Sequence, residues 1–337
     1  MKKDIQVTGL GNALVDLQYE VSEHELADLE FEKGMMTLVD VAKQKQVMAK
    51  FQDRMHNRCS GGSAANTIIA FAAFGGSAAY KTHLGADHLG DYYFKEFQDL
   101  GIHLHAEQTD SDPTGTCFVM ITPDSERTMV THLGATALHK KDHIDGNIIK
   151  RSEWFYVEGY KFSEHGSTEA VNHSVGLCKE YDTKIALTFS DKFIIDVFRE
   201  RLDFAVKNSD LVFCNDIEAR AYTGLHSAKD AFDKLCQNVP NVCVTLGKDG
   251  SLVKWDDKVY EILPYQAQLT DTTGAGDMYA AGFLYGIIDT GNAEIAGHLA
   301  SYSASLIVSQ LGARLTRNHK SMRDKIYEAH KFGRLNK

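Results

Sequence analysis

Apolar residues along this chain follow two alternating patterns. Short runs rich in β-branched and aromatic residues are followed by longer runs with helical spacing. The strand-like runs are DIQVTGLG, SAAYKTHLG, EWFYVEG, KIALTFS, DLVFCN and NVCVTLG, and the clearest helical runs are SAANTIIAFAAFGG and HLGDYYFKEFQDLG. Strands that alternate with helices favour a parallel sheet with helices on both faces. The pattern therefore predicts an α/β fold with three layers.

Two segments interrupt this alternation. Residues 15–40 and 103–131 contain strand-like pieces without crossover helices between them, namely LVDLQYEVS, GMMTLVD, GTCFVMITP and RTMVTHLG. Such strands suggest a small antiparallel sheet that covers a pocket at the C-terminal ends of the parallel strands. The alternative is that they extend the edge of the main sheet. Because the sequence shows no flexible linker, we expect residues 1–337 to form one domain with the two segments as its lid.

Composition and charge argue against several classes of function. The 337 residues are 43% hydrophobic and 24% charged, which is ordinary for a globular protein with a large core. The formal net charge is -10 and Lys and Arg form no run longer than a pair, so we expect no nucleic-acid partner. The N-terminal stretch MKKDIQVTGLGNALVDLQYE is interrupted by polar residues and resembles neither a signal peptide nor a membrane span. We expect a cytoplasmic protein with no membrane partner.

Cysteine and histidine give no sign of a metal site in the sequence. The six cysteines form no C-x-x-C pair, and Cys117, Cys214 and Cys243 lie within apolar strand-like runs. We expect all six to be reduced residues of the core. The 15 histidines show no H-E-x-x-H motif and no tight ligand spacing. We therefore expect no transition metal held by the protein.

The stretch DTTGAGDMYAAGFLYG, residues 271–286, combines small residues with an apolar run. Gly274, Ala275 and Gly276 have almost no side chain, so their backbone amides can approach a ligand closely. The apolar run over 278–288 predicts a buried helix behind them. A helix N-terminus offers free N–H donors and the positive end of the helix dipole. The stretch therefore predicts a phosphate-binding site.

Asp277 falls in the first turn of that helix and has two interpretations. It is either a favourable helix-terminal charge or a general base that accepts a proton from a hydroxyl attacking a phosphoryl group. Of two other nucleotide-binding motifs, the Walker loop is absent and the dinucleotide fingerprint is only a weak match. The Gly247-Lys248 pair is followed by Asp249, so there is no Walker loop, and GLGNAL has Leu14 in place of the third glycine of a dinucleotide fingerprint.

A second loop of small residues, SGGSAAN, also leads into a helix. Gly61 and Gly62 permit close backbone approach, and the Asn66 amide could bind a polar substrate, although tight helix–sheet packing explains the same residues. Asn12 and Asp16 follow the first strand at its expected C-terminal end, where ligand sites of α/β sheets form. Asp16 could accept hydrogen bonds from vicinal hydroxyls, and as a bare pattern it is equally typical of a turn.

The motifs GLGNALVD, SGGSAAN, CNDIEA, TLGKDG and DTTGAGD, in this order, resemble those of the ribokinase, or PfkB, family of carbohydrate and nucleoside kinases. The resemblance covers nearly the whole chain. LTFSDKFIIDVF and ERTMVTHLGA are similar to segments of the adenosine kinases in this family, whereas SAAN is closer to the bacterial sugar-kinase form. The resemblance implies a ribokinase-like three-layer α/β fold with a small β-sheet lid.

The resemblance also implies a reaction. A kinase of this family would transfer the γ-phosphate of ATP, with Mg²⁺, to a hydroxymethyl oxygen. The expected acceptor is the 5′-hydroxyl of a purine nucleoside, adenosine first, and the alternative is a neutral sugar such as ribose or fructose. A third hypothesis is a catalytically silent member that senses a nucleoside or binds a partner.

Residue roles follow from the same resemblance. Asp277 would be the base, Gly274 and the amides of Ala275, Gly276 and Asp277 would form the anion hole, and Arg127 would neutralise the moving phosphate. The alternative for Arg127 is a solvated turn residue. The positions that match the family's sugar-binding residues are Asn12, Asp16, Gly61, Gly62 and Asn66.

The resemblance places the nucleotide and cations in the second half of the chain. Asn215 and Glu218, the N-x-x-E element, would position Mg²⁺ through water, and they also fit a helix cap. The positions expected beside ATP are Thr245, Gly247 and Gly250, with the helical segment NAEIAGHLASYSASLIVSQLGA beside adenine. K⁺ is a further expectation, with oxygens near Asp271, Gln310 and Gly312.

Charge near the expected pocket bears on the acceptor. Residues 4–32 contain no Lys or Arg. A phosphorylated sugar would need cations, whereas a neutral nucleoside needs an apolar wall for its base. The candidates for that wall are Leu14, Leu17, Phe31, Met35 and Met36, and the alternative is that they form the core of the lid.

The lid could cover the pocket within one subunit or pair across a dimer, so both a monomer and a homodimer fit.

Overall fold

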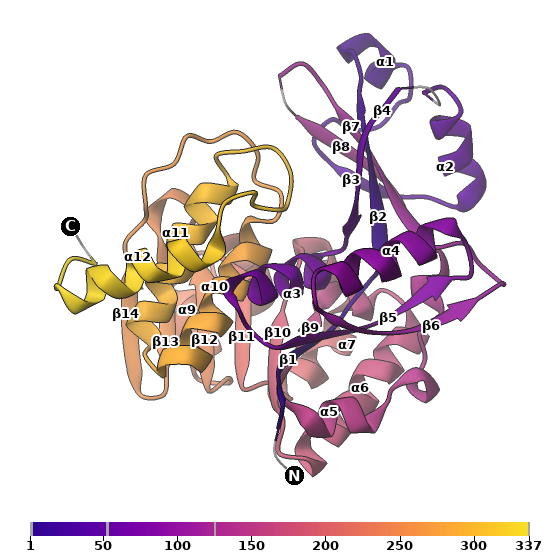
Figure 1. Cartoon of the computed structure of the whole chain (residues 1–337). Helices are drawn as coiled ribbons and strands as arrows, with labels where there is room; N and C mark the ends of the chain where they lie inside the picture. The colour runs from indigo at the N-terminus through magenta and orange to yellow at the C-terminus, as the bar shows by residue number, and fades with distance from the viewer. Residues whose placement is uncertain (1–2, 52–53, 125, 336–337) are drawn as a thin grey trace.

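The computed structural model describes residues 3–51, 54–124 and 126–335. Within these residues, nine strands form the main sheet in the order β14-β13-β12-β11-β10-β9-β1-β5-β6 (Figure 1). Their bounds are β1 Ile5–Leu10, β5 Ala78–Gly85, β6 His103–Thr109, β9 Ser152–Glu158, β10 Lys184–Thr188, β11 Leu211–Asn215, β12 Asn241–Thr245, β13 Ser251–Trp255 and β14 Lys258–Ile262. The strands from β6 to β12 run parallel, and β13 and β14 add an antiparallel edge.

Alternate residues of each central strand are buried on opposite faces of this sheet. On β9, Trp154 and Tyr156 join one apolar core, whereas Phe155 and Val157 join the other. A strand covered on both faces needs a continuous apolar run rather than an alternating one. This is why the central strands were recognisable in the sequence.

Helices cover both faces, so the predicted three-layer α/β fold is confirmed (Figure 1). One face carries α3 Ser63–Phe74, α4 His88–Asp99, α10 Ala275–Thr290, α11 Ala293–Ile307 and α12 His319–Lys331. The other carries α5 Gly146–Arg151, α6 His165–Glu180, α7 Lys192–Asn208, α8 Asp216–Thr223 and α9 Ala228–Cys236. The helix α10 packs against both α3 and α11, which places its N-terminus beside the start of α3.

A five-stranded second sheet forms the lid, in the order β3-β8-β7-β2-β4, and projects from the main sheet at the top of Figure 1. Its strands are β2 Leu14–Glu20, β3 Met36–Leu38, β4 Met55–Gly61, β7 Gly115–Ile121 and β8 Arg127–His132, and α1 Glu23–Ala27 and α2 Val41–Met48 accompany them. A small sheet lid was expected, and the structure has one.

The lid differs from its predicted form in three respects. Residues 103–109 form β6, which pairs with β5 in the main sheet, so the edge-extension alternative holds for them. The strand β4 was not predicted, since its first four residues are exposed and three of them are polar, and pairing with β2 holds it in place. The sheet is mixed rather than antiparallel. Because β2 and β7 both leave the same end of the parallel main sheet, they enter the lid side by side in parallel.

The predicted glycine stop of α3 is present. The helix ends at Gly75 in a left-handed conformation with φ 112°, which a glycine adopts without strain. The next predicted helix, α4, ends at Asp99 with Leu100 as its cap, two residues before the expected Gly101. Within the described part of the chain, no helix has the length and apolar character needed to cross a membrane.

Candidate active site

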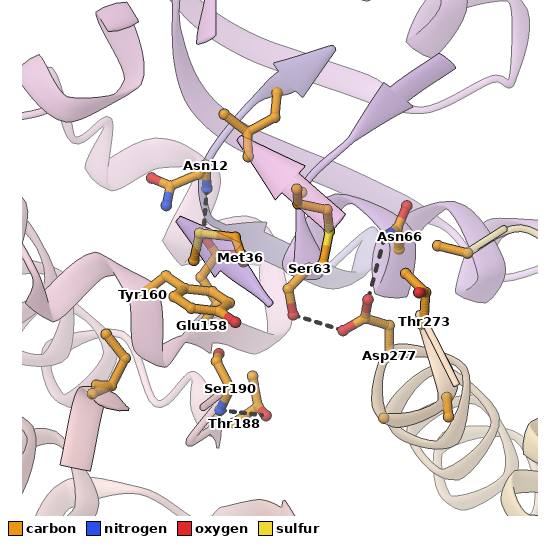
Figure 2. A pocket seen from close by; sticks show the side chains of 18 of the residues that line it. Asn12, Met36, Ser63, Asn66, Glu158, Tyr160, Thr188, Ser190, Thr273 and Asp277 are labelled. Carbon is orange, nitrogen blue, oxygen red and sulfur yellow. Dashed lines mark hydrogen bonds between the residues drawn. The ribbon is translucent and has the colours of Figure 1, made fainter. Parts of the chain in front are cut away.

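A cavity of about 510 Å³ lies between the lid and the C-terminal ends of the parallel strands (Figure 2). The last residues of four neighbouring strands line it, namely Glu158 of β9, Thr188 of β10, Asn215 of β11 and Thr245 of β12. Ligands of open α/β sheets bind at this edge because the loops after the strands converge there. The lid supplies the facing wall through β2, β3, β7 and β8.

The N-terminus of α10 opens into this cavity. Gly274 caps the helix with φ 76° and no side-chain cap, and Gly274, Ala275 and Gly276 all line the cavity. The Ala275 amide donates to the Thr272 carbonyl at 3.2 Å. The following amides, of Gly276 and Asp277, belong to the first turn of the helix, where N–H groups have no partner within the helix. These donors and the helix dipole suit an anion.

Asp277 is held by two donors from α3. Its Oδ1 accepts from Ser63 Oγ at 2.6 Å, and its Oδ2 accepts from Asn66 Nδ2 at 3.3 Å (Figure 2). Burial raises the pKa of Asp277 to about 6, although both hydrogen bonds act in the opposite direction. A carboxylate with its pKa near the working pH is suited to accept a proton from a hydroxyl. Ser63, which sequence reasoning missed, follows Gly62 directly and was within the quoted motif.

The paired glycines bring β1, β2 and α3 together. Gly62 has φ 107°, and a Cβ there would lie 2.1 Å from the Asn12 carbonyl oxygen. A Cβ on Gly61 would lie 2.6 Å from Asp16 Oδ1. Position 62 therefore requires glycine, whereas a side chain at position 61 would displace the Asp16 carboxylate. Asn12, Asp16 and Gly62 line the cavity, and Gly61 does not.

Asp16 is the second carboxylate on this side of the cavity. Burial raises its pKa to about 6, and the nearby charges of Arg127 and Arg314 act against that rise. Its position on β2, facing the start of α3, lets a ligand be held between the lid and the main sheet.

A buried Glu–Lys pair supports Asn12, and the sequence reasoning missed it. Glu158 accepts from the Asn12 amide at 2.6 Å and from the Ala64 amide at 2.7 Å, while Lys161 Nζ donates to Asn12 Oδ1 at 2.9 Å. Burial raises the pKa of Glu158 and lowers that of Lys161. Glu158 is the last residue of β9, within the run EWFYVEG, so the strand-end position that marked Asn12 would have identified it as well.

A loop after β10 forms another part of the wall. Ser190 has φ 67°, a left-handed conformation that is uncommon for a residue other than glycine. Its hydroxyl accepts from the Gly159 amide at 2.9 Å, and its amide donates to Thr188 Oγ1 at 3.3 Å (Figure 2). These bonds hold the LTFSDKF segment at the cavity, together with Tyr160.

Arg127 and Asp271 lie outside the lining of the cavity and bind each other. Arg127 Nη1 lies 3.1 Å from Asp271 Oδ2, and both residues are buried, with exposed fractions of 6% and 9%. The amides of Gly312 and Thr273 also donate to the Asp271 carboxylate, each at 2.8 Å. The alternative of a solvated Arg127 is therefore wrong. Gln310, which was also expected near K⁺, donates from its side-chain amide to the Arg314 carbonyl at 2.7 Å.

Asn215 and Glu218 form a complete capping box at the start of α8. The Glu218 amide donates to Asn215 Oδ1 at 2.8 Å, and the Asn215 amide donates to Glu218 Oε2 at 3.0 Å. Burial raises the pKa of Glu218 to about 7. Both residues line the cavity, so the cap and a role toward a ligand are compatible.

The structure separates the three residues expected beside ATP. Thr245 lines the cavity, whereas Gly247 and Gly250 lie in the turn after β12, outside the cavity lining. Both glycines have positive φ, and a Cβ on Gly250 would lie 2.1 Å from the Ile262 carbonyl oxygen. They shape the turn that follows Thr245.

Only some of the apolar lid residues expected beside the acceptor line the cavity. Leu14 and Met36 line the cavity, whereas Leu17 and Phe31 pack in the lid core and Met35 is exposed. The wall is completed by residues that sequence reasoning did not name, including Leu38, Met129, Leu133, Phe193 and Ile194.

All six cysteines are free, with Cys59 and Cys236 only half-buried rather than in the core.

Comparison with known proteins agrees with this geometry. The model of the pfkB family carbohydrate kinases matches residues 32–320. An adenosine kinase of Saccharomyces cerevisiae is 26% identical over 324 residues, covering 90% of this chain and 94% of the relative. The crystal structure of an adenosine kinase from Sinorhizobium meliloti superposes with a TM-score of 0.87 at 28% identity, covering 95% and 99% of the two chains.

A sugar kinase is equally similar in structure. The crystal structure of a probable sugar kinase protein from Rhizobium etli has a TM-score of 0.87 at 26% identity and covers 99% of both chains. The family match spans most of the chain, and its fold and cavity agree with a phosphotransferase that uses an alcohol group as acceptor. The chain belongs to the pfkB family of carbohydrate kinases.

Proposed function

We propose that this protein transfers the γ-phosphoryl group of ATP to the 5′-hydroxyl of a purine nucleoside, with adenosine as the first candidate. The observation that supports this proposal most directly is the position of the Asp277 carboxylate. Ser63 and Asn66 hold it at the N-terminus of α10, and it lines a cavity with an apolar lid wall. Relatives with the name adenosine kinase support the choice of acceptor. A neutral sugar is the second candidate, supported by the similar sugar kinase.

In this proposal, Asp277 accepts the proton of the attacking hydroxyl. Phosphoryl transfer depends mainly on alignment and on stabilisation of charge. The amides of Gly276 and Asp277 supply that stabilisation, because they lie at the positive end of α10. The Ala275 amide would join them by exchanging the Thr272 carbonyl for the phosphate. Arg127 would add a positive charge once it leaves Asp271.

The other hydroxyls of the acceptor would bind on the same side of the cavity, where Asn66 contacts Asp277. Asp16 can accept from two vicinal hydroxyls, and Asn12 and Asn66 can each donate and accept. Gly61 and Gly62 permit the close approach of β2 to α3 that places these groups together.

The rest of the cavity wall favours an uncharged acceptor with an apolar part. No lysine or arginine occurs among the described residues that line it. Leu14, Met36 and Phe193 do line it and contribute apolar surface. A sugar phosphate would leave its charge unpaired at such a wall. A nucleobase would instead gain apolar contact from these side chains.

The residues at the strand ends fit Mg²⁺ and ATP. Glu218 and Asn215 present oxygens at the cavity, and because the Glu218 carboxylate already accepts from Asn215, we expect it to act through water. Mg²⁺ neutralises charge on the phosphates when it is bound. Thr245, Gly247 and Gly250 would lie along ATP, and Asp271 remains a candidate neighbour of K⁺. We also propose a single domain acting in the cytoplasm as a monomer or homodimer.

The test is release of ADP from ATP over a panel of adenosine, inosine, guanosine, ribose, fructose and fructose 6-phosphate. The proposal expects the highest kcat/KM with adenosine and negligible turnover of fructose 6-phosphate. If no nucleoside is phosphorylated while ribose or fructose is, the second candidate replaces the first. If nothing is phosphorylated, the chain is a silent member of the family.

A further inference from the structure

Three potential metal ligands meet on the main sheet outside the catalytic cavity. They are His83 on β5, Glu107 on β6 and His143 in the short 3-10 helix Lys141–His143, and one ligand atom of each lies within 4.8 Å of the others. His83 and Glu107 are directly paired in the register of β5 and β6. None of the three lines the cavity. Their separation along the chain explains why no ligand spacing was visible in the sequence.

Two buried imidazoles, His83 of this group and the neighbouring His139, have no hydrogen-bond partner in the described part of the chain. His83 is 5% exposed and His139 is 0% exposed, and none of their four ring nitrogens has a hydrogen-bond partner among the described residues. The His143 ring lies 4.7 Å from that of His83 and 5.8 Å from that of His139, between centroids. Buried polar groups are normally bonded, and an unpaired one costs free energy. A bound ion would satisfy nitrogens that the fold leaves unpaired.

The Glu107 carboxylate is held by a neighbouring residue of β5. Lys81 binds Oε2 of Glu107 and leaves the other carboxylate oxygen for a second partner. A bond of this kind orients a ligating carboxylate.

We propose that His83, Glu107 and His143 bind a transition-metal ion of borderline softness, Zn²⁺ first. Two imidazoles and one carboxylate are a common donor set for this ion, with a fourth position left for water or for His139. Tetrahedral bonds of the usual length separate ligand atoms by roughly 3.4 Å, so the side chains of the half-buried Glu107 and His143 must move inward slightly.

A bound ion would connect the segment after β8, which carries His143, to β5 and β6 at the edge of the main sheet. That segment includes Thr136, whose hydroxyl accepts from the Ala13 amide at 3.2 Å and whose carbonyl accepts from Lys161 at 3.1 Å. Lys161 in turn donates to Asn12. Metal binding would therefore stiffen the support behind Asn12 without adding a group to the cavity.

The test is titration of the full chain, without nucleotide, with Zn²⁺ and separately with Co²⁺. We expect one bound Zn²⁺ per chain by calorimetry and a higher Tm in its presence, because the ion binds the folded state. His143→Gln and Glu107→Gln should each weaken binding by about tenfold or more. His165→Gln is the matched control, since His165 is exposed and lies beside Glu169 on a single helix, and it should bind as the wild type does.

The Co²⁺ spectrum separates this site from the half-buried cysteines. The proposal expects tetrahedral d–d bands without a thiolate-to-metal charge-transfer band. A thiolate band, unchanged affinity in the His143→Gln and Glu107→Gln variants, or no binding by a folded wild-type chain would each overturn it. Circular dichroism of the variants shows that any loss of binding occurs in a folded protein.

Discussion

Arg127 of the lid and Asp271 of the loop before α10 form a buried ion pair, with 3.1 Å between Nη1 and Oδ2. The pair links the lid to the loop that leads into α10, whose first turn carries Asp277. Arg127 Nε has no partner among the described residues, so the guanidinium retains an unused donor in this conformation. Removal of one member of such a pair leaves a buried charge without compensation.

We expect Asp271→Ala to lower the free energy of unfolding by about 3–5 kcal/mol, because Arg127 and the amides of Gly312 and Thr273 lose their acceptor. Urea unfolding followed by circular dichroism measures the change. Asp99→Ala is the control, since Asp99 pairs with Lys95 on the exposed face of one helix and should matter little.

A double-mutant cycle shows whether the unpaired charge causes this loss. Arg127→Met in the Asp271→Ala background removes that charge, so the double variant should lose less than the sum of the single variants. Additive losses would contradict the pairing as the cause.

Asp277→Asn tests the proposed base. The amide keeps the size of the side chain and cannot accept the proton, so we expect kcat to fall by about 10²–10⁴-fold while KM for ATP stays nearly constant. Asp289→Asn lies near the other end of the same helix, outside the cavity lining, and should leave both constants unchanged. Full activity in Asp277→Asn would rule out the base.

The central strands were predictable because burial on both faces demands continuous apolar runs, as in residues 153–159. The strand β4 was not, since its position depends on pairing with β2 rather than on its own apolar residues. Motifs located the loops at Gly62 and Asp277 because small residues followed by an apolar helix are a local signal.

Contacts between residues far apart in the sequence could not be predicted from such local signals. Glu158 and Lys161 are polar in the sequence and buried in the fold, and only the assembled sheet edge shows that they bind Asn12. The ion pair of Arg127 with Asp271 likewise depends on how the lid sits over α10.

The raised pKa of Asp277 predicts an acid limb in the pH profile. As pH falls through about 6, the carboxylate gains a proton and can no longer act as a base, so kcat should decline. Ser63 donates to the charged carboxylate and lowers its pKa, so Ser63→Ala should move the acid limb to higher pH.

A control variant distinguishes this shift from a general structural effect. Ser309→Ala removes a hydroxyl in the turn after α11 that donates to the Ser305 carbonyl outside the cavity lining, and its acid limb should match that of the wild type. An unshifted limb in Ser63→Ala would mean that another group titrates there, with Asp16 the first alternative because burial also raises its pKa to about 6.

Two glycine-to-alanine variants separate folding from phosphate binding. A Cβ on Gly276 meets no atom within 4 Å, so Gly276→Ala should fold with an unchanged or higher Tm, while its methyl group crowds a phosphate beside the first amides of α10. We expect kcat/KM to fall. In Gly62→Ala, φ 107° and the 2.1 Å approach to the Asn12 carbonyl should lower Tm and activity together. Thermal unfolding beside steady-state kinetics measures both, and a fully active Gly276→Ala enzyme would place the transferred phosphate elsewhere in the cavity.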